Sequence, residues 1–199
     1  MERRQQILEA AKRVFAKEGF HGATIESIAE EAGLKAPSLV YWYFKSKKEL
    51  FQAMLEELSP VLKQLSNLWG RIDDPPEEML SFIAVTILST LDNPESRQFL
   101  RIFLSEAPRI PETANDFAEK MVLALNFVIS YLEHQIDRGT LRRHDTQGSS
   151  RAFIGALVFY LMGRELFIPL RAGLPTTDLY AKEVVTIFLK GLRPDTESR

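Results

Sequence analysis

The most informative stretch of the chain runs from Thr24 to Leu50 and reads TIESIAEEAGLKAPSLVYWYFKSKKEL. Its apolar residues recur three and four positions apart, which predicts short helices rather than strands. The hydroxyl of Thr24 suits the cap of one helix, and Gly33 suits its end, because glycine readily adopts the left-handed conformation. Pro37 fits the first turn of the next helix, where the backbone amide has no helical partner. Two short helices joined by a glycine turn predict a helix-turn-helix.

The same helical spacing extends over the whole chain, so the expected fold class is all-α. We expect an amino-terminal three-helix helix-turn-helix domain over residues 1–50 and a helical bundle over residues 51–199, with about nine helices in all. The helix from Lys47 to Trp69 is the only segment expected to join the two domains, and Pro60 predicts a kink or break in it. The first helix is expected to stop at Gly19, and later helices are expected at residues 76–91, 94–106, 111–138, 149–168 and 177–191.

The composition excludes several classes of protein. The 199 residues are 45% hydrophobic and include no low-complexity tract, which predicts a folded globular chain. No cysteine is present, so disulfides, thiolate metal sites and cysteine nucleophiles are excluded. The uncharged run from Ala152 to Gly163 has 12 residues, whereas a bilayer span needs roughly 20. With no signal-peptide pattern behind Met1, a cytoplasmic protein without membrane contacts is expected.

Charge is unevenly distributed along the chain, whose 25 Lys or Arg and 27 Asp or Glu give a net charge of -2. Residues 1–50 hold nine basic and seven acidic residues, a balance of +2, whereas residues 51–199 hold 16 and 20, a balance of -4. Between Gly33 and Lys48 lie four lysines and no acidic residue. Lysines beside hydroxyl and aromatic side chains suit phosphate and base contacts, so a local DNA-binding surface is predicted. The alternative is a solvated basic face beside core aromatic residues.

The order of residues in this stretch resembles the DNA-binding domain of the TetR family of bacterial transcription regulators. The resemblance covers about residues 3–55 and includes the ending Tyr41-x-x-Phe44-x-x-Lys47. The segment from Gly33 to Phe44 is one residue longer than is usual in the family, which leaves Leu39 or Val40 as an extra residue.

The resemblance implies DNA contacts at specific positions. A serine hydroxyl can bond several bases and an alanine can touch a thymine methyl group, so these residue types do not dictate one sequence. The implied contacts are Thr24, Tyr41 and Lys47 on phosphates, Lys35, Ala36, Pro37, Ser38 and Trp42 near base edges, and Tyr43 in a mixed role as core and phosphate contact. Phe44 is expected in the core, where it locks this helix onto the first.

The carboxy-terminal part predicts a dimer. Residues 152–163 are apolar on all sides, so one side is expected to face a second subunit or a cavity. The last helix carries another apolar stripe, and together these helices predict a four-helix interface, two from each chain, which matches the arrangement of the family. The alternative is a monomer with a plain core. The interface residues expected are Ala152, Gly155, Ala156, Gly163, Val184, Val185, Phe188 and Leu192.

The resemblance also implies an effector cavity enclosed by the middle helices. With 13 Phe in the chain and few polar groups on these faces, an apolar or acyl-type small molecule is expected. The same helical spacing also fits an ordinary core. The pocket residues expected are Trp69, Phe99, Phe103, Met121, Leu125, Phe127, Tyr131, Phe159 and Met162.

The expected function is therefore a transcriptional regulator, a repressor that binds palindromic double-stranded DNA as a homodimer and is released by a small effector. Two alternatives stay open: a helix-turn-helix regulator controlled by a protein partner, and a helical enzyme. The chain has no Gly-rich phosphate loop, His-Glu-x-x-His or Gly-x-Ser-x-Gly motif, so no catalytic residue, metal site or cofactor is expected. His134 with Asp137, and more weakly His144 with Asp145, are the nearest approaches to a catalytic pair.

Overall fold

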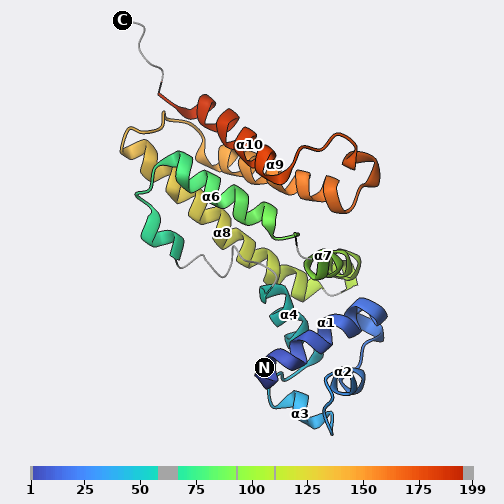
Figure 1. Ribbon diagram of the computed structural model, residues 1–199. Coiled ribbons are helices and arrows are strands. Elements are labelled where there is room, and N and C mark those ends of the chain that lie inside the picture. Colours follow the sequence, from blue (N-terminus) through green and yellow to red (C-terminus); the bar gives the residue numbers. More distant parts are fainter. Residues whose placement is uncertain (1, 58–66, 93, 110, 195–199) are drawn as a thin grey trace, which may run out of the picture. The chain divides into compact units, whose positions relative to one another are not determined.

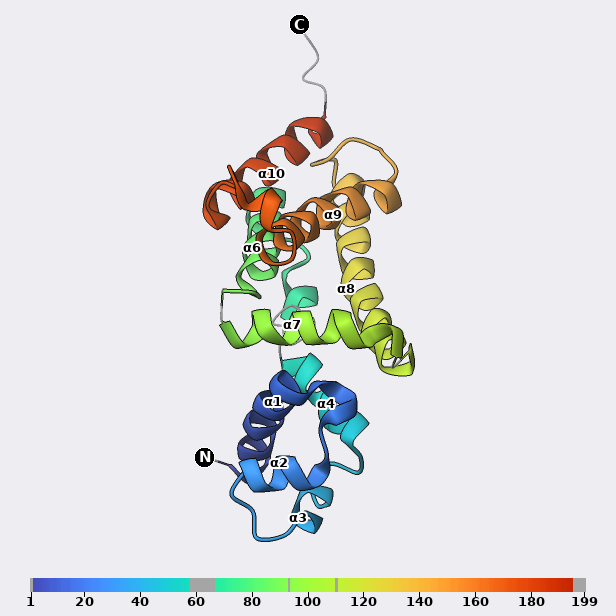
Figure 2. The same cartoon turned by 90° about the vertical axis from the view of Figure 1, so that its right-hand side faces the viewer.

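The computed structural model describes residues 2–57, 67–92, 94–109 and 111–194. Within these ranges every regular element is helical (Figures 1 and 2), which confirms the all-α class. None of the described helices is long and apolar enough to span a bilayer. The elements are α1 (Arg3–Gly22), α2 (Ile25–Glu31), α3 (Ser38–Tyr41), α4 (Lys47–Glu57), η1 (Trp69–Arg71), α6 (Pro76–Ser89), α7 (Pro94–Glu106), η2 (Ala107–Arg109), α8 (Pro111–Asp137), α9 (Thr146–Glu165), η3 (Ile168–Arg171) and α10 (Thr177–Leu192).

The chain divides into two compact units. The first, here called the head, comprises residues 1–59 and 93–119, and the second, the body, comprises residues 60–92 and 120–199. α8 is one helix that begins in the head and continues into the body. The segment from Lys47 to Trp69 is therefore not the sole connection, which corrects the expectation from the sequence. Pro60 and its expected kink lie outside the described residues, and the predicted boundary at residue 50 stays a prediction.

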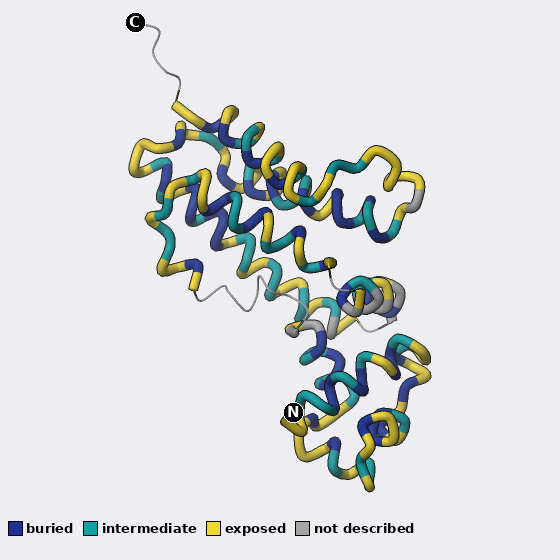
Figure 3. The backbone as a smooth tube through the Cα atoms, viewed as in Figure 1, coloured by how far each residue is buried: buried dark blue, intermediate teal, exposed yellow. Residues whose placement is uncertain are grey.

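The head has a core rich in phenylalanine. Phe15 of α1 and Phe51 of α4 meet edge-on, with 5.3 Å between their ring centroids, and Phe20 meets the same ring at 5.0 Å. Phe103 of α7 belongs to this core. Edge-to-face packing suits the charge distribution of aromatic rings and adds to the gain from burial. Figure 3 shows buried and exposed residues alternating along α1, as in an amphipathic helix.

Caps and glycine turns form the helix-turn-helix. Thr24 Oγ1 accepts a hydrogen bond from the Ser27 amide at 3.0 Å, and Ser27 Oγ accepts one from the Thr24 amide at 3.1 Å, which is a reciprocal capping box. α1 is interrupted at Gly19, where φ is 71°, and α2 is followed by Gly33, where φ is 64°. A residue with a side chain is strained at such angles. The predicted Thr24 cap and the end of the second helix at Gly33 are confirmed, whereas α1 is kinked at Gly19 and continues to Gly22 instead of stopping there.

The body is built around α6, α8, α9 and α10. The ring centroids of Tyr160 and Tyr180 lie 4.3 Å apart, and those of Phe153 and Phe188 lie 5.0 Å apart. Because these pairs run in opposite order along the two helices, α9 and α10 are antiparallel. Figure 1 shows the two helices side by side. The Tyr180 hydroxyl donates to the carbonyl oxygen of Ala156 at 3.0 Å, which fixes their register.

Candidate nucleic-acid interface

The head exposes an aromatic surface directly after the glycine turn. Tyr41, Trp42 and Tyr43 are 52%, 80% and 40% exposed. The residues directly before and after them in the sequence, Val40 and Phe44, are fully buried in the head core. The predicted core position of Phe44 is confirmed. Exposed aromatic side chains grouped on a rigid base are typical of a binding surface.

The residues before these aromatics complete one short segment. Lys35 and Ser38 are exposed, whereas Ala36 and Pro37 are partly buried. The Val40 amide donates to the carbonyl oxygen of Pro37 at 3.0 Å, which begins the short helix α3. We call residues 35–43 the reading segment. It presents an ammonium group, a hydroxyl and three aromatic rings, the groups that contact phosphates and base edges in a DNA groove.

Thr24 lies exposed at the start of α2. Its hydroxyl is engaged in the capping box, and its own amide donates to Ser27 Oγ at 3.1 Å. The amides of a helix start attract anions. The position suits a phosphate, and the contact itself stays a prediction.

Lys47 lies at the start of α4, but its ammonium group contacts the end of α1. Nζ donates to the carbonyl oxygens of Ala23 at 2.7 Å and His21 at 3.4 Å, and it lies 4.7 Å from the centroid of the Phe20 ring. Partial burial lowers the pKa of Lys47, and the Glu106 carboxylate opposes this shift. The sequence did not indicate this structural role, since the carbonyl partners lie 24 and 26 residues earlier.

Lys48, the next residue, is paired with an acidic residue of α8. Its ammonium group donates to Glu112, and this hydrogen bond lowers the pKa of the Glu112 carboxyl. One turn further along both helices, Gln52 donates to Asp116. Glu49 instead caps the start of α4, because its Oε2 accepts from the Lys45 amide at 2.7 Å. The Lys48 ammonium group is therefore engaged by one carboxylate of α8, that of Glu112.

The residues predicted for an effector pocket are not all brought together. Phe103 is buried in the head core, and Phe159 is 62% exposed on α9, so neither joins the others. The side chain of Phe99 lies outside the described part of the chain. Trp69 meets the buried Phe127 edge-on at 5.1 Å, and Phe127 stacks with Tyr131 at 6.3 Å. Within the body, the remaining candidates are Trp69, Met121, Leu125, Phe127, Tyr131 and Met162.

α9 and α10 both carry large apolar side chains that are exposed, and together these side chains are called the apolar strip. Val158 and Phe159 of α9 and Leu179 and Ile187 of α10 are exposed large side chains. Of the predicted interface residues, Ala152 and Gly155 are also exposed, and Ala156, Val184 and Phe188 are partly buried. Val185 and Leu192 are buried within the protomer and Gly163 packs against Leu170, so these three do not belong to an exposed stripe. α10 packs against α6 with Val185 buried, and Ile187 is exposed instead.

The two histidines considered in the sequence each have a hydrogen-bonding partner in the structure. His134 Nε2 lies 2.9 Å from Asp73 Oδ1, and His144 Nδ1 lies 2.8 Å from the carbonyl oxygen of Arg142. In the described ranges, no group of three His, Asp or Glu side chains is placed to bind a metal ion.

This fold and this exposed segment define a helix-turn-helix DNA-binding protein. Residues 7–54 match the family described as bacterial regulatory proteins of the tetR family, and residues 78–191 match the C-terminal domain of AefR-like transcriptional repressors. The chain belongs to the TetR family and is a DNA-binding transcriptional regulator.

Individual relatives agree with this assignment. The transcriptional regulator SrpR of Pseudomonas putida is 29% identical over 165 residues, which cover 78% of this chain and 72% of that protein. SmeT, the repressor of a multidrug efflux pump of Stenotrophomonas maltophilia, has the same fold, with a TM-score of 0.75 and 23% identity. The match covers 97% of this chain and 91% of that chain. FadR of Bacillus subtilis in complex with stearoyl-CoA also shares the fold, with a TM-score of 0.68 and 18% identity. The match covers 94% of this chain and 98% of that chain.

Proposed function

We propose that this regulator is a cytoplasmic repressor that binds a palindromic operator as a homodimer and is released by a small apolar or acyl-type effector. The observation that carries the proposal is the exposed reading segment, residues 35–43, fixed on a phenylalanine core. One head of this size offers few contacts, so tight specific binding requires two heads in successive major grooves, about 34 Å apart.

The apolar strip on α9 and α10 supports the homodimer. Phe159 and Ile187 are each 62% exposed, and small residues beside them, such as Gly155, leave room for another helix. A second copy of the same strip would cover these side chains in a twofold-symmetric interface. The resulting four-helix arrangement would use two helices from each chain.

The composition of the body supports the effector class. Its candidate pocket residues are thioether, aliphatic and aromatic side chains, which favour an apolar ligand. FadR of Bacillus subtilis, which has the same fold, was solved with stearoyl-CoA. An acyl chain is therefore the first ligand to test.

A direct test uses a DNA duplex selected by the wild-type protein from a random library. Fluorescence anisotropy should show tight binding, light scattering should give twice the 22.7 kDa chain mass, and stearoyl-CoA should release the DNA. A monomeric mass at micromolar concentration would overturn the dimer. Release by none of an acyl-CoA, fatty-acid and drug panel would favour control by a protein partner.

The reading segment is tested by separating two kinds of contact. Tyr41→Phe should weaken binding to all duplexes equally, because a phosphate contact carries no sequence information. Ser38→Ala and Lys35→Ala should instead change the ranking among selected duplexes. The opposite pattern would show that the assigned roles are wrong.

A further inference from the structure

The first turn of α1 carries two arginines, Arg3 and Arg4, outside the helix-turn-helix itself. We propose that these two side chains form an additional DNA contact, which binds backbone phosphates flanking the bases read by residues 35–43. The inference rests on DNA binding by the head and extends the interface to a part of the chain that precedes the helix-turn-helix.

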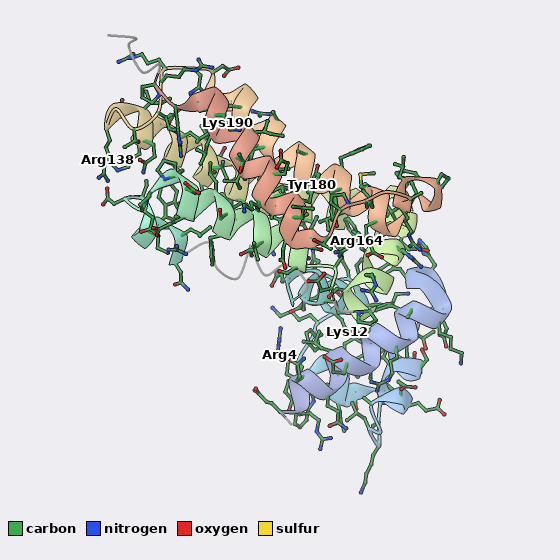
Figure 4. The ribbon with its side chains drawn as sticks, turned by 45° about the horizontal axis from the view of Figure 1, so that its top comes forward. Arg4, Lys12, Arg138, Arg164, Tyr180 and Lys190 are labelled. Atoms are coloured by element: carbon green, nitrogen blue, oxygen red, sulfur yellow. The ribbon has the colours of Figure 1, made fainter. Side chains whose placement is uncertain are left out.

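Two contacts place this turn beside the reading segment. Gln6 Nε2 donates to the carbonyl oxygen of Ala32 at 2.7 Å, directly before the Gly33 turn. The guanidinium carbon of Arg4 lies 5.0 Å from the centroid of the Phe44 ring, directly after Tyr43. The start of α1 therefore contacts the chain on both sides of the reading segment. Figure 4 shows Arg4 at this amino-terminal end of the helix.

Neither arginine has an acidic partner in the described part of the chain. Arg3 Nη1 donates to Gln6 Oε1, a neutral acceptor, at 2.8 Å, and Arg4 contacts an aromatic ring. Two other cations of α1 are already paired: Lys12 with Glu9 at 2.7 Å and Arg13 with Glu31 at 2.5 Å. Both Arg3 and Arg4 are exposed. They can exchange solvent counterions for phosphate without first breaking an ion pair.

The chemistry favours phosphate as the ligand. A guanidinium group resting on an aromatic face keeps its edge N–H groups available, and that edge matches two phosphate oxygens. Phe44 is fully buried in the head core, so the ring that supports Arg4 is itself fixed. Arg4 lies beyond the end of the reading segment and meets the sugar-phosphate backbone next to the bases that are read. The expected contribution is affinity and salt dependence rather than sequence preference.

The test compares Arg4→Met with Arg4→Lys and the wild type. Methionine keeps an apolar side chain over the Phe44 ring and removes the charge, whereas lysine keeps the charge. Affinity is measured against salt on the selected duplex with about ten flanking base pairs, roughly one helical turn, and on the same duplex trimmed to the half-sites. On the flanked duplex, Arg4→Met should reduce the salt slope by about 0.9 per protomer and the affinity roughly fivefold to tenfold at 0.1 M salt. Arg4→Lys should restore the slope.

On the trimmed duplex, the wild type and Arg4→Met should bind equally. Arg13→Met is the matched control, because it removes one charge from the same helix at a position already paired with Glu31, and it should bind like the wild type. Arg3→Gln should also lower the salt slope on the flanked duplex, and this variant leaves the contact between Arg4 and the Phe44 ring in place. Equal slopes for Arg4→Met and the wild type on the flanked duplex, or the same loss on both duplexes, would overturn the proposal. Failure of the wild type to bind any duplex would overturn the proposed function instead.

Discussion

The ammonium nitrogen of Lys47 lies 2.7 Å from the carbonyl oxygen of Ala23, the residue that caps the end of α1. A cation at the start of α4 thus joins that helix to the end of α1. Any phosphate bound by Lys47 would be bound by a side chain that also positions the head. A change at this residue should therefore alter stability as well as DNA affinity.

Lys47→Met should lower the free energy of unfolding by about 1–2 kcal/mol, because the carbonyl oxygens of Ala23 and His21 lose a charged donor. Urea denaturation followed by circular dichroism measures this change. Lys45→Met is the control, since the exposed Lys45 side chain has no ion pair in the described ranges. If Lys47→Met weakened DNA binding with an unchanged urea midpoint, the structural role would be wrong.

Glu112→Gln should strengthen DNA binding, because it releases Lys48 from its ion pair. The pair is exposed, so its own strength is small, and the gain should be roughly threefold. A released lysine that reaches a phosphate should also increase the salt slope by about 0.9 per protomer. Glu119→Gln removes the same charge from α8 at an exposed position and serves as the control. When Lys48 is already replaced by Ala, adding Glu112→Gln should give no gain in DNA affinity. A gain in that double variant over Lys48→Ala alone would exclude this explanation.

Local signals account for what the sequence predicted well. The Thr24 cap, the Gly19 and Gly33 turns and the proline-led starts of α6, α7 and α8 depend on residues within one helical turn. Such positions are set by backbone geometry and need no knowledge of the remaining chain.

Contacts between distant residues account for what the sequence did not predict. The ring of Phe103 was assigned to an effector pocket but packs in the head, because α7 lies against α1. Val185 and Ile187 are both apolar and two positions apart, and only the packing of α10 on α6 determines that Val185 is buried and Ile187 exposed. The acidic partner of Lys48 lies 64 residues away. Helical periodicity identifies an apolar face but not its partner.

Ile187→Glu should break the homodimer while leaving the protomer folded, because this side chain is exposed on α10. Phe188→Glu would be less informative, since the Phe188 ring packs against Phe153 with 5.0 Å between centroids and its loss would disturb the protomer itself. Light scattering and thermal denaturation together check the result. Val85→Glu, at an exposed apolar position on α6, is the control for adding a charge. A dimeric Ile187→Glu variant would place the interface elsewhere.

The body should lose stability in alkaline solution through Tyr131. This hydroxyl donates to the carbonyl oxygen of Asp74 at 2.6 Å, and burial raises the pKa of Tyr131 far above its usual value. In the unfolded chain the phenol ionises near pH 10. The stabilisation of the folded body by the neutral Tyr131 hydroxyl is therefore complete below about pH 10. It is lost as the pH rises above that value, because the unfolded chain then releases the phenol proton more readily than the folded one.

Tyr131→Phe should reduce this alkaline loss and cost about 1 kcal/mol at neutral pH through the missing hydrogen bond. Burial also raises the pKa of Tyr180, so part of the alkaline loss of stability should remain in Tyr131→Phe. Urea midpoints between about pH 8 and pH 11 measure both effects. Tyr41→Phe removes an exposed hydroxyl from the head and should keep the wild-type profile. An equally steep alkaline loss in Tyr131→Phe would contradict the assignment.

α8 is one helix with residues in both the head and the body. Its first turns contact α4 through Glu112 and Asp116, and its continuation in the body carries Met121 and Leu125, two of the candidate pocket residues. An effector that shifts α8 would change how its carboxylates meet the start of α4. Thermodynamic linkage then requires the effect to be reciprocal.

If stearoyl-CoA weakens DNA binding tenfold, it must itself bind about tenfold more weakly to the DNA complex, a coupling of roughly 1.4 kcal/mol. Asp116→Asn weakens the hydrogen bond with Gln52 of α4, and it should reduce this coupling while changing each separate affinity less. Calorimetry of stearoyl-CoA with the free protein and with the DNA complex gives both values. Glu119→Asn, on the same helix, should leave the coupling unchanged. Equal stearoyl-CoA affinities for the free and DNA-bound wild type would exclude release by this ligand, because a ligand with no preference between two states cannot shift their equilibrium.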